Sequence, residues 1–238
     1  MSINYSKTVF LLIFLLALAS RGSSQGNIYA ALYPKDCQNA KEFYAQHKVL
    51  FETAAHTVGL TPQFLFAIVA PELTQYSFLS NKIETYSLKV FYVQGGKPYA
   101  NFSIGYFQMK PSFVELLEET AAADTHLQTK YATCLFDQPD KRAARVTRID
   151  RLNTVEWQLT YLSLFCEILQ KRFSNLAFAT MEEQLRFYAS AYNCGFHKSE
   201  QQIKETAQKA LFPHFSTQKF KYSDIAVWFY QEIMRECF

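Results

Sequence analysis

The sequence lacks the features that would place it in several common functional classes. Its five cysteines include no C-x-x-C pair, so it encodes neither a zinc knuckle nor a dithiol redox motif. Its formal net charge is only +3, from 24 basic and 21 acidic side chains, so it has no global basic field for nucleic acid. It contains no internal repeat and no low-complexity tract. These absences favour one globular domain that has no nucleic-acid partner.

The sequence also lacks an apolar run long enough to cross a bilayer as a helix. The N-terminal run, Val9–Ala19, has about half of the roughly 20 residues that such a helix needs. Lys7 precedes the run, and Ala17 and Ala19 stand at the A-x-A spacing of a cleavage site. We therefore expect residues 1–19 to be the signal peptide of an exported protein, with no stable membrane span after cleavage. An uncleaved anchor is the alternative.

An exported chain can form disulfides, but five cysteines leave at least one thiol unpaired within the chain. Their positions are Cys37, Cys134, Cys166, Cys194 and Cys237. Cys194 and His197 come nearest to the spacing of metal ligands, yet no further ligand stands near them in the sequence. We expect both to be structural or surface residues, and we expect no metal and no other cofactor.

Apolar periodicity predicts a mainly helical fold. From Lys41 to Val58 apolar side chains recur at intervals of three and four, and Gly59 ends that helix. Thr61-Pro62 starts the next helix, whose residues 64–70 are apolar nearly all round, so this helix must be buried. Further helices are predicted over Phe113–Ala123, Asn153–Phe173, Met181–Tyr192, Glu200–Leu211 and Ser223–Glu236.

Two stretches depart from this helical pattern. Between Val90 and Ser103, β-branched and aromatic residues flank Gln94-Gly95-Gly96-Lys97, which predicts a β-hairpin. Thr125–Arg151 is polar and basic, and is expected as loop or short helix. Its cluster of basic residues fits a solvated surface, with contact to an anionic polymer as the alternative. The cluster consists of Lys141, Arg142, Arg145, Arg148 and Arg151.

One carboxyl group stands out as a candidate for chemistry. Glu72 follows an apolar stretch that has no other ionisable side chain, and Pro71 predicts that the helix kinks or ends there. Desolvation would raise the pKa of this carboxyl group, as a general acid requires near neutral pH. Taken alone, a glutamate at a helix end is more often exposed or paired with a basic residue.

Two later segments carry polar groups that suit a binding site. Phe102–Pro111 combines Gly105, where backbone can approach a ligand, with the amide of Gln108 and a proline that opens the next helix. Ala189–Gly195 ends a helix with the phenol of Tyr192 and the amide of Asn193. Separately, each segment is also a common structural feature: a turn before a helix, and a glycine-capped helix end.

In this order the three segments resemble the soluble lytic transglycosylases of the lysozyme-like superfamily. The match runs from Thr61-Pro62 to Glu72, then through Gly105-x-x-Gln108-x-x-Pro111, then Ala191-Tyr192-Asn193-x-Gly195, and spans roughly residues 45–200. The resemblance implies a mainly α, lysozyme-like domain with a small β-hairpin next to the substrate groove. It assigns residues 20–40 to an N-terminal extension and 41–238 to the transglycosylase domain.

The resemblance also implies an activity. Glu72 would act as general acid and base on the glycosidic bond between N-acetylmuramic acid and N-acetylglucosamine of peptidoglycan, with the sugar's own C6 hydroxyl as nucleophile and a 1,6-anhydro product. Gly105, Gln108, Tyr192 and Asn193 would bind the substrate. The expected partners are peptidoglycan glycan strands, and the expected location is the bacterial periplasm or outside the cell.

Departures from the family pattern leave alternatives open. Leu73 follows Glu72 where many members have Ser, although Thr74 or Ser77 could supply a hydroxyl. A catalytically inactive peptidoglycan-binding envelope protein is therefore one alternative. A second carboxylate near Glu72 would instead make a hydrolysing lysozyme, with Glu84, Glu115 and Asp124 as candidates that are otherwise surface charges. A set of aromatic residues could form a groove wall for sugars or fill a local core: Phe91, Tyr92, Tyr99 and Phe102.

Overall fold

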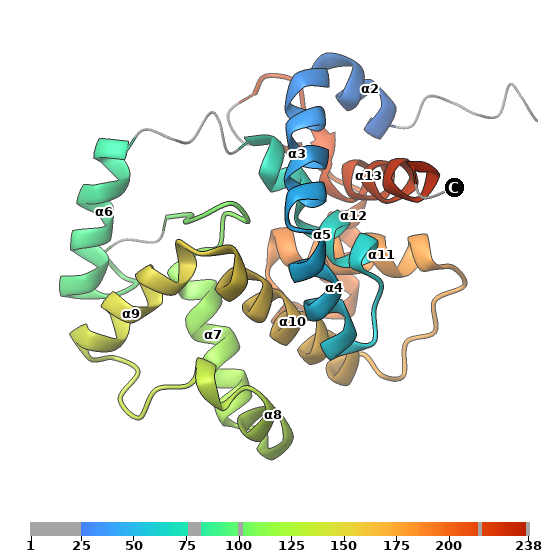
Figure 1. Ribbon diagram of the computed structural model, residues 1–238. Coiled ribbons are helices and arrows are strands. Elements are labelled where there is room, and N and C mark those ends of the chain that lie inside the picture. The colour runs from blue at the N-terminus through green and yellow to red at the C-terminus, as the bar shows by residue number, and fades with distance from the viewer. Residues whose placement is uncertain (1–24, 76–81, 100–101, 214–215, 237–238) are drawn as a thin grey trace, which may run out of the picture.

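A computed structural model of the chain describes residues 25–75, 82–99, 102–213 and 216–236, and the arrangement of its helices is shown in Figure 1. These residues form twelve α-helices, labelled α2 to α13. The first six are α2 (Gln25–Leu32), α3 (Pro34–Gln46), α4 (Lys48–Val58), α5 (Pro62–Gln75), α6 (Lys82–Gly95) and α7 (Pro111–Ala122). The remaining six are α8 (Thr125–Lys130), α9 (Arg142–Leu152), α10 (Val155–Arg172), α11 (Met181–Cys194), α12 (Glu200–Ala207) and α13 (Tyr222–Glu236). A short 3-10 helix covers Ala132–Cys134.

The strands of the described chain are β1 (Ala210–Phe212) and β2 (Phe220–Lys221), which pair antiparallel. The structure therefore confirms a mainly helical fold with a small β-hairpin. The predicted position of the hairpin is wrong, because β1 lies where the sequence predicted the end of a helix. The hairpin leads directly into α13, so it fixes where that helix begins.

Helix α5 lies at the centre of the fold. Residues 64–70 are fully buried, as their apolar character predicts, and α3, α4, α11 and α13 pack around them. Gly59 ends α4 in the left-handed conformation, with φ of 66°, and Thr61 Oγ1 accepts a hydrogen bond from the Phe64 amide at the start of α5. Both end signals are therefore confirmed.

Among the described residues, no single helix is long and apolar enough to cross a membrane. Only α4 and α5 taken together reach that length and composition, and they are bent by 115° relative to each other.

The predicted helix from Lys41 to Val58 is two helices. Helix α3 ends at Gln46, and His47 interrupts the chain before α4 begins. The His47 ring stacks on Phe43 and bonds its backbone oxygen, so local side-chain contacts compete with a continuous helix. Residues 25–40, expected as an extension, form α2 and half of α3 and pack against α13 and α5.

The segment predicted as a β-hairpin between Val90 and Ser103 is helical up to Gly95. Gly96, with φ of 78°, ends α6, and its amide donates to the oxygen of Tyr92. Arg145 of α9 donates to the last carbonyl groups of the helix, on Val93 and Gln94. Contacts with α9 thus satisfy the end of a helix that local sequence preference did not indicate.

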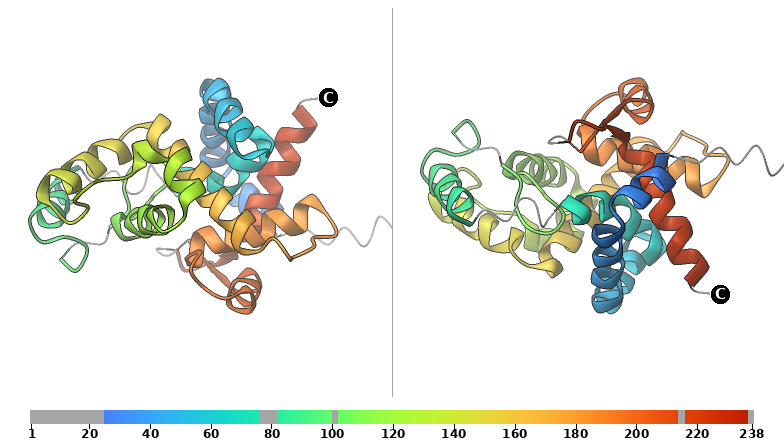
Figure 2. Two further views of the ribbon diagram at one scale, coloured as in Figure 1. Left: turned by 90° about the horizontal axis from the view of Figure 1, so that it is seen from below. Right: turned by 90° about the horizontal axis from the view of Figure 1, so that it is seen from above.

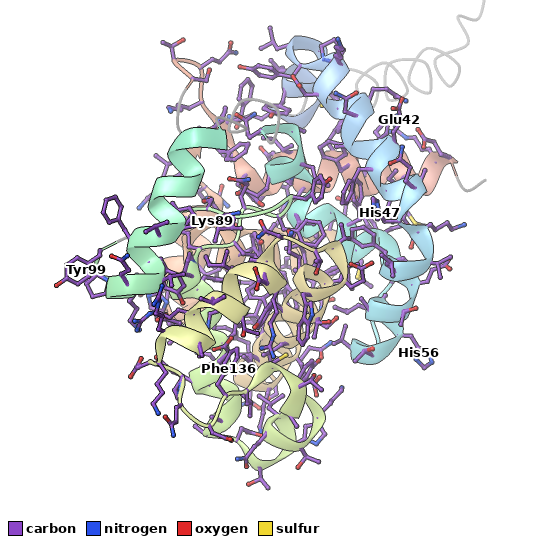
Figure 3. All side chains as sticks on the ribbon, turned by 60° about the vertical axis from the view of Figure 1, so that its left-hand side comes forward. Glu42, His47, His56, Lys89, Tyr99 and Phe136 are labelled. Atoms are coloured by element: carbon purple, nitrogen blue, oxygen red, sulfur yellow. The ribbon has the colours of Figure 1, made fainter. Side chains whose placement is uncertain are left out.

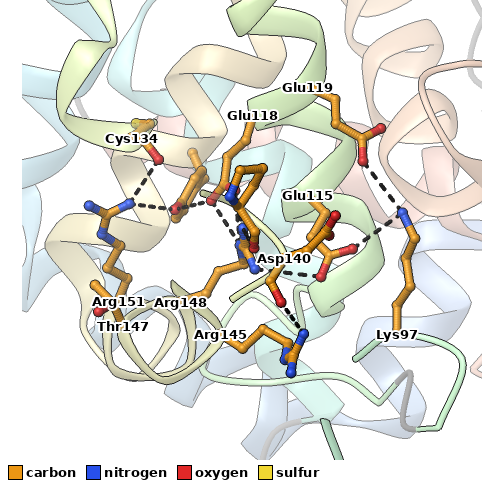
Figure 4. A network of polar contacts seen from close by, with 12 residues as sticks. Lys97, Glu115, Glu118, Glu119, Cys134, Asp140, Arg145, Thr147, Arg148 and Arg151 are labelled. Atoms are coloured by element: carbon orange, nitrogen blue, oxygen red, sulfur yellow. Dashed lines mark hydrogen bonds and ion pairs between the residues drawn. The ribbon is translucent and has the colours of Figure 1, made fainter. Parts of the chain in front are cut away.

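The basic segment packs inside the molecule as well as on its surface. Arg148 is completely buried and pairs with Glu118 at 2.6 Å, while its Nη1 donates to the Tyr92 hydroxyl at 2.8 Å, as Figure 4 shows for the surrounding network. The Arg151 guanidinium lies over the rings of Phe136 and Trp157. The expectation that this cluster of basic residues forms a wholly solvated face is therefore wrong.

Helices α6 to α9 lie on one side of α10, and α2 to α5 with α13 lie on the other, as Figures 1 and 2 show from three directions. The loop 102–110 runs from α6 to α7, which both belong to the first group. It contacts α3 through the Tyr106 ring, which packs against Phe43, and α11 through the Phe107 backbone oxygen, which accepts from Tyr192. The candidate site lies where this loop meets α5, α11 and α13.

Candidate functional site

Glu72 lies in the last turn of α5, which continues through Pro71 to Gln75. The predicted end of the helix at Glu72 is therefore wrong, because α5 continues for three more residues, while the alternative of a kink at Pro71 stays a prediction. Two side chains support the backbone around the proline: the Tyr222 hydroxyl donates to the oxygen of Ile68 at 3.0 Å, and Thr74 Oγ1 donates to the oxygen of Pro71 at 2.7 Å. Tertiary hydrogen bonds thus stabilise a turn that proline disfavours.

The environment of Glu72 raises its pKa to about 8. Burial is the main cause, because it penalises the charged carboxylate, while a hydrogen bond with Tyr222 and the positive charge of Lys110 act in the opposite direction. The residue nevertheless keeps part of its surface accessible. Glu72 is therefore a partly exposed residue whose carboxyl group is desolvated and holds its proton at neutral pH.

Tyr222, the first residue of α13, is a polar partner of Glu72. Its hydroxyl hydrogen-bonds with the Glu72 carboxyl group and also donates to the Ile68 oxygen. A phenol has one proton, so it donates either to the Ile68 oxygen or to the Glu72 carboxylate. The bond to Glu72 favours the charged form of Glu72 and therefore opposes the rise in pKa that burial causes. Sequence reasoning missed Tyr222, since no local pattern distinguishes it from other tyrosines.

The loop 104–109 carries Gln108 and contacts Tyr192 through the backbone oxygen of Phe107. Ile104 and Met109 form an isolated antiparallel bridge that closes the loop, and both Gly105 (φ 72°) and Gln108 (φ 51°) adopt left-handed conformations. A side chain at Gly105 would overlap Gln158, whose Nε2 and Oε1 bond the oxygen of Leu152 and the amide of Phe107. Gly105 is thus a requirement of packing, and its predicted role in substrate binding stays a prediction.

Gln108 is partly exposed, and its Nε2 donates to the Gly105 oxygen at 2.7 Å. This bond to the backbone of the same loop fixes the orientation of the Gln108 side-chain amide. A left-handed φ at a residue other than glycine is uncommon and costs about 1–3 kcal/mol, which the closed loop must supply. The structure therefore holds Gln108 in one defined orientation.

The third segment contacts the second directly. The Tyr192 hydroxyl donates a 2.7 Å hydrogen bond to the backbone oxygen of Phe107, and its ring packs edge-on against Phe113. Burial raises the pKa of Tyr192, and the charge of Glu72 adds to that effect, so the two side chains are near enough to interact electrostatically. Asn193 is partly exposed at the end of α11. The structure thus brings Glu72, Tyr192 and the 104–109 loop together.

Two of the three candidate second carboxylates, Glu115 and Asp124, form ion pairs with other side chains. Glu115 is buried, accepts from the Tyr92 hydroxyl at 2.7 Å and pairs with Lys97 and Arg148, so the expectation of a surface charge is wrong for it. Asp124 caps α8 and pairs with Lys171. The side chains of Glu84 and Ser77 lie outside the described residues. Leu73 and Thr74 are both buried.

The aromatic residues between α6 and the loop divide into two kinds. Tyr92 is fully buried and belongs to the Glu115–Arg148 network, and Phe102 packs partly buried against the core. Phe91 and Tyr99 are 54% and 73% exposed, and Figure 3 shows Tyr99 projecting from the end of α6. Neither ring bonds with Glu72 or its neighbours, so the local-core interpretation holds for only half of the set.

The cysteines of the described chain are free thiols: Cys37, Cys134, Cys166 and Cys194. Cys237 lies outside the described residues. Burial raises the pKa of the Cys37 thiol to about 12, with Asp36 adding to the effect. Within the described part of the chain, no group of three or more His, Cys, Asp or Glu side chains is arranged to hold a metal ion.

No family model, no curated protein and no solved structure matches this chain. The fold and the site by themselves define a mainly helical protein with a desolvated carboxyl group of raised pKa that interacts with two tyrosines.

Proposed function

We propose that the chain is an exported peptidoglycan lytic transglycosylase that acts on the glycan strands of the bacterial cell wall, with Glu72 as its acid and base. The observation that carries the proposal is the meeting of Glu72, Tyr192 and the 104–109 loop, with the pKa of Glu72 raised to about 8. A carboxyl group that holds its proton at neutral pH can protonate a leaving oxygen, as glycosidic bond cleavage requires.

The reaction divides between Glu72 and the substrate. Protonated Glu72 gives its proton to the glycosidic oxygen as the bond between that oxygen and the anomeric carbon breaks. The resulting carboxylate then takes the proton of the C6 hydroxyl of the same sugar, whose oxygen bonds to the anomeric carbon. The products are a free 4-hydroxyl end and a 1,6-anhydro sugar, and Glu72 ends in its starting protonated state.

The surroundings of Glu72 favour an internal nucleophile over water activated by a second carboxylate. The described groups that act on the pKa of Glu72 are Tyr222 and Lys110, and neither is an acid. Retaining and inverting glycosidases both use a second carboxylate close to the first. Tyr222 suits a different task, because it can accept from the acid form of Glu72 and donate to its carboxylate form.

The test compares purified wild type with Glu72→Gln on intact peptidoglycan, with soluble products identified by mass spectrometry. Glu42→Gln is the matched control, since Glu42 is an exposed glutamate on α3 that accepts only from Gln38 of its own helix (Figure 3). We expect anhydro-muropeptides from wild type and from Glu42→Gln, and none from Glu72→Gln.

Other products would overturn parts of the proposal. Hydrated reducing ends would indicate a lysozyme. Glycan binding by wild type without any product would indicate an inactive binding protein. Neither binding nor products would contradict a role on peptidoglycan altogether.

A further inference from the structure

Tyr29 of α2 contacts the last turn of α5 from a position 45 residues earlier in the sequence. Its side chain is completely buried, and its hydroxyl lies 2.5 Å from Thr74 Oγ1 and 3.0 Å from Gln75 Nε2. Thr74 and Gln75 are the second and third residues after Pro71–Glu72 in the same helical turn. A residue from the first described helix therefore holds the turn that carries the candidate acid.

The hydrogen bonds among Gln75, Tyr29 and Thr74 form a chain in which each group donates to the next. The Thr74 hydroxyl donates to the Pro71 oxygen, so its own oxygen accepts from Tyr29, and Tyr29 in turn accepts from Gln75 Nε2. The chain thus runs from Gln75 through Tyr29 and Thr74 to the backbone oxygen immediately before Glu72. Bonds in such a chain polarise one another, so the three side chains act as one unit.

The ring of Tyr29 also contacts the hairpin that precedes Tyr222. It packs against Phe220 of β2 at 5.2 Å between centroids and against Phe212 of β1 at 6.5 Å. Tyr29 contributes to the raised pKa of Tyr222, which places the two phenols near each other. Tyr29 therefore lies between the two elements, α5 and the start of α13, that supply Glu72 and its hydrogen-bond partner.

The position of α2 itself is set closely. A Cβ atom at Gly26 would lie 2.5 Å from Trp228 Cβ and 2.6 Å from the Asp224 oxygen, so only glycine allows α2 to approach α13 this closely. The amide of Lys221 also donates to Gln25 Oε1 at 2.7 Å. These contacts fix α2 against β2 and the first turns of α13, and so hold the Tyr29 hydroxyl next to that of Thr74.

We propose that Tyr29 is a positioning residue for Glu72: the helix that follows the expected signal peptide orients the catalytic turn of α5 through the Tyr29–Thr74–Gln75 contacts. The catalytic part of this inference rests on the function proposed above. Its structural part stands by itself, because the orientation of Glu72 can be measured without any substrate.

The experiment uses Tyr29→Phe, which keeps the ring and removes the hydroxyl. Tyr33→Phe is the matched control, since the Tyr33 ring packs 4.8 Å from that of Tyr29 but its hydroxyl bonds Ser216 at 3.3 Å, away from α5. The first readout is the titration midpoint of the Glu72 carboxyl carbon by NMR, assigned with Glu72→Gln. The second is the pH profile of kcat for glycan cleavage, with KM measured in parallel.

We expect Tyr29→Phe to lower the Glu72 midpoint from about 8 toward the usual range of a carboxyl group, because a looser turn admits water. We expect kcat to fall roughly ten- to a hundredfold with little change in KM, as misplacement of a catalytic group causes. The titratable groups that interact with Glu72, which are Tyr192, Tyr222 and Lys110, remain unchanged in this variant, and Tyr33→Phe should alter neither readout.

A second pair of variants covers the case in which Tyr29→Phe does not fold. Thr74→Val removes the hydroxyl at constant volume and should reproduce both changes. Thr74→Ser keeps the hydroxyl and should leave both readouts at their wild-type values. A folded Tyr29→Phe or Thr74→Val with an unchanged Glu72 midpoint would overturn the positioning role. Absence of cleavage by wild type, with the midpoint still shifted by Tyr29→Phe, would contradict only the proposed activity.

Discussion

The hydroxyl of Tyr192 donates a 2.7 Å hydrogen bond to the backbone oxygen of Phe107. Phe107 lies between Gly105 and Gln108 in the loop that precedes α7, whereas Tyr192 lies in the last turn of α11. The bond therefore joins two segments that are 85 residues apart in the sequence. Because the charge of Glu72 also acts on the pKa of Tyr192, this phenol connects the loop with the candidate acid.

Replacement of Tyr192 by phenylalanine should release the loop without emptying the core. The variant leaves the Phe107 oxygen without its donor, a loss of about 1–3 kcal/mol for a buried polar group. We expect a lower kcat for glycan cleavage and a fold that is otherwise retained. Tyr188→Phe, one turn earlier on α11 and also buried, is the control that should keep full kcat. Equal kcat values for the two variants would contradict a role of this bond in the site.

The raised pKa of Glu72 makes a prediction about stability that is independent of activity. The folded state keeps the proton up to about pH 8, whereas the unfolded chain releases it near pH 4.5. Between these values the folded state binds more protons, so the free energy of unfolding should fall as the pH rises, by at most about 1.4 kcal/mol per pH unit. Glu72→Gln should remove this slope and be more stable than wild type above pH 8.

Urea unfolding of wild type, Glu72→Gln and Glu42→Gln at intervals from pH 5 to pH 9 measures the slope. Glu42→Gln should retain the wild-type dependence, since Glu42 is exposed on α3. A wild-type slope that survives in Glu72→Gln would show that another group is responsible.

Two glycines with left-handed backbone allow a comparison of strain with packing. Gly59 (φ 66°) has open space where a Cβ would lie, so Gly59→Ala should cost about 1–2 kcal/mol for the backbone conformation alone. Gly105 (φ 72°) has Gln158 and the Leu152 oxygen in that space, so Gly105→Ala should cost the same amount plus about 1–3 kcal/mol of overpacking. Chemical denaturation of both variants gives the difference. Equal losses would mean that the loop can shift to accommodate a side chain.

The Arg148 ion pair should be essential for folding of the α6–α9 group. Arg148 is fully buried between Glu118 and Glu115, and burial raises the pKa of Glu118 even though Arg148 opposes that effect. Arg148→Met leaves Glu118 without its paired cation and Glu115 with Lys97 alone, so we expect a loss of about 3–5 kcal/mol in the free energy of unfolding.

Arg142→Met, an exposed change on the same helix α9, should alter stability by less than about 0.5 kcal/mol. Addition of Glu118→Gln to Arg148→Met should recover part of the loss, because it removes the uncompensated charge. A small effect of Arg148→Met would mean that water enters the cluster and solvates the carboxylates.

The sequence by itself was sufficient to predict the features that depend only on residues adjacent in the chain. The left-handed end at Gly59, the cap at Thr61 and the burial of residues 64–70 follow from the preferences of a few adjacent side chains, and these features place Glu72 at the end of a core helix. The mainly helical character follows from periodicity for the same reason. What local patterns determined is therefore the position of the acid along the chain.

Only the tertiary structure decided the surroundings of that acid. Tyr222 and Tyr29 come from the two ends of the described chain, the helical state of 82–95 depends on Arg145 of α9, and the burial of Arg148 depends on Glu118 of α7. Each of these contacts joins residues that are far apart in the sequence, so no local preference could indicate it. The pKa of Glu72, and with it the chemistry open to the site, arises from that long-range packing.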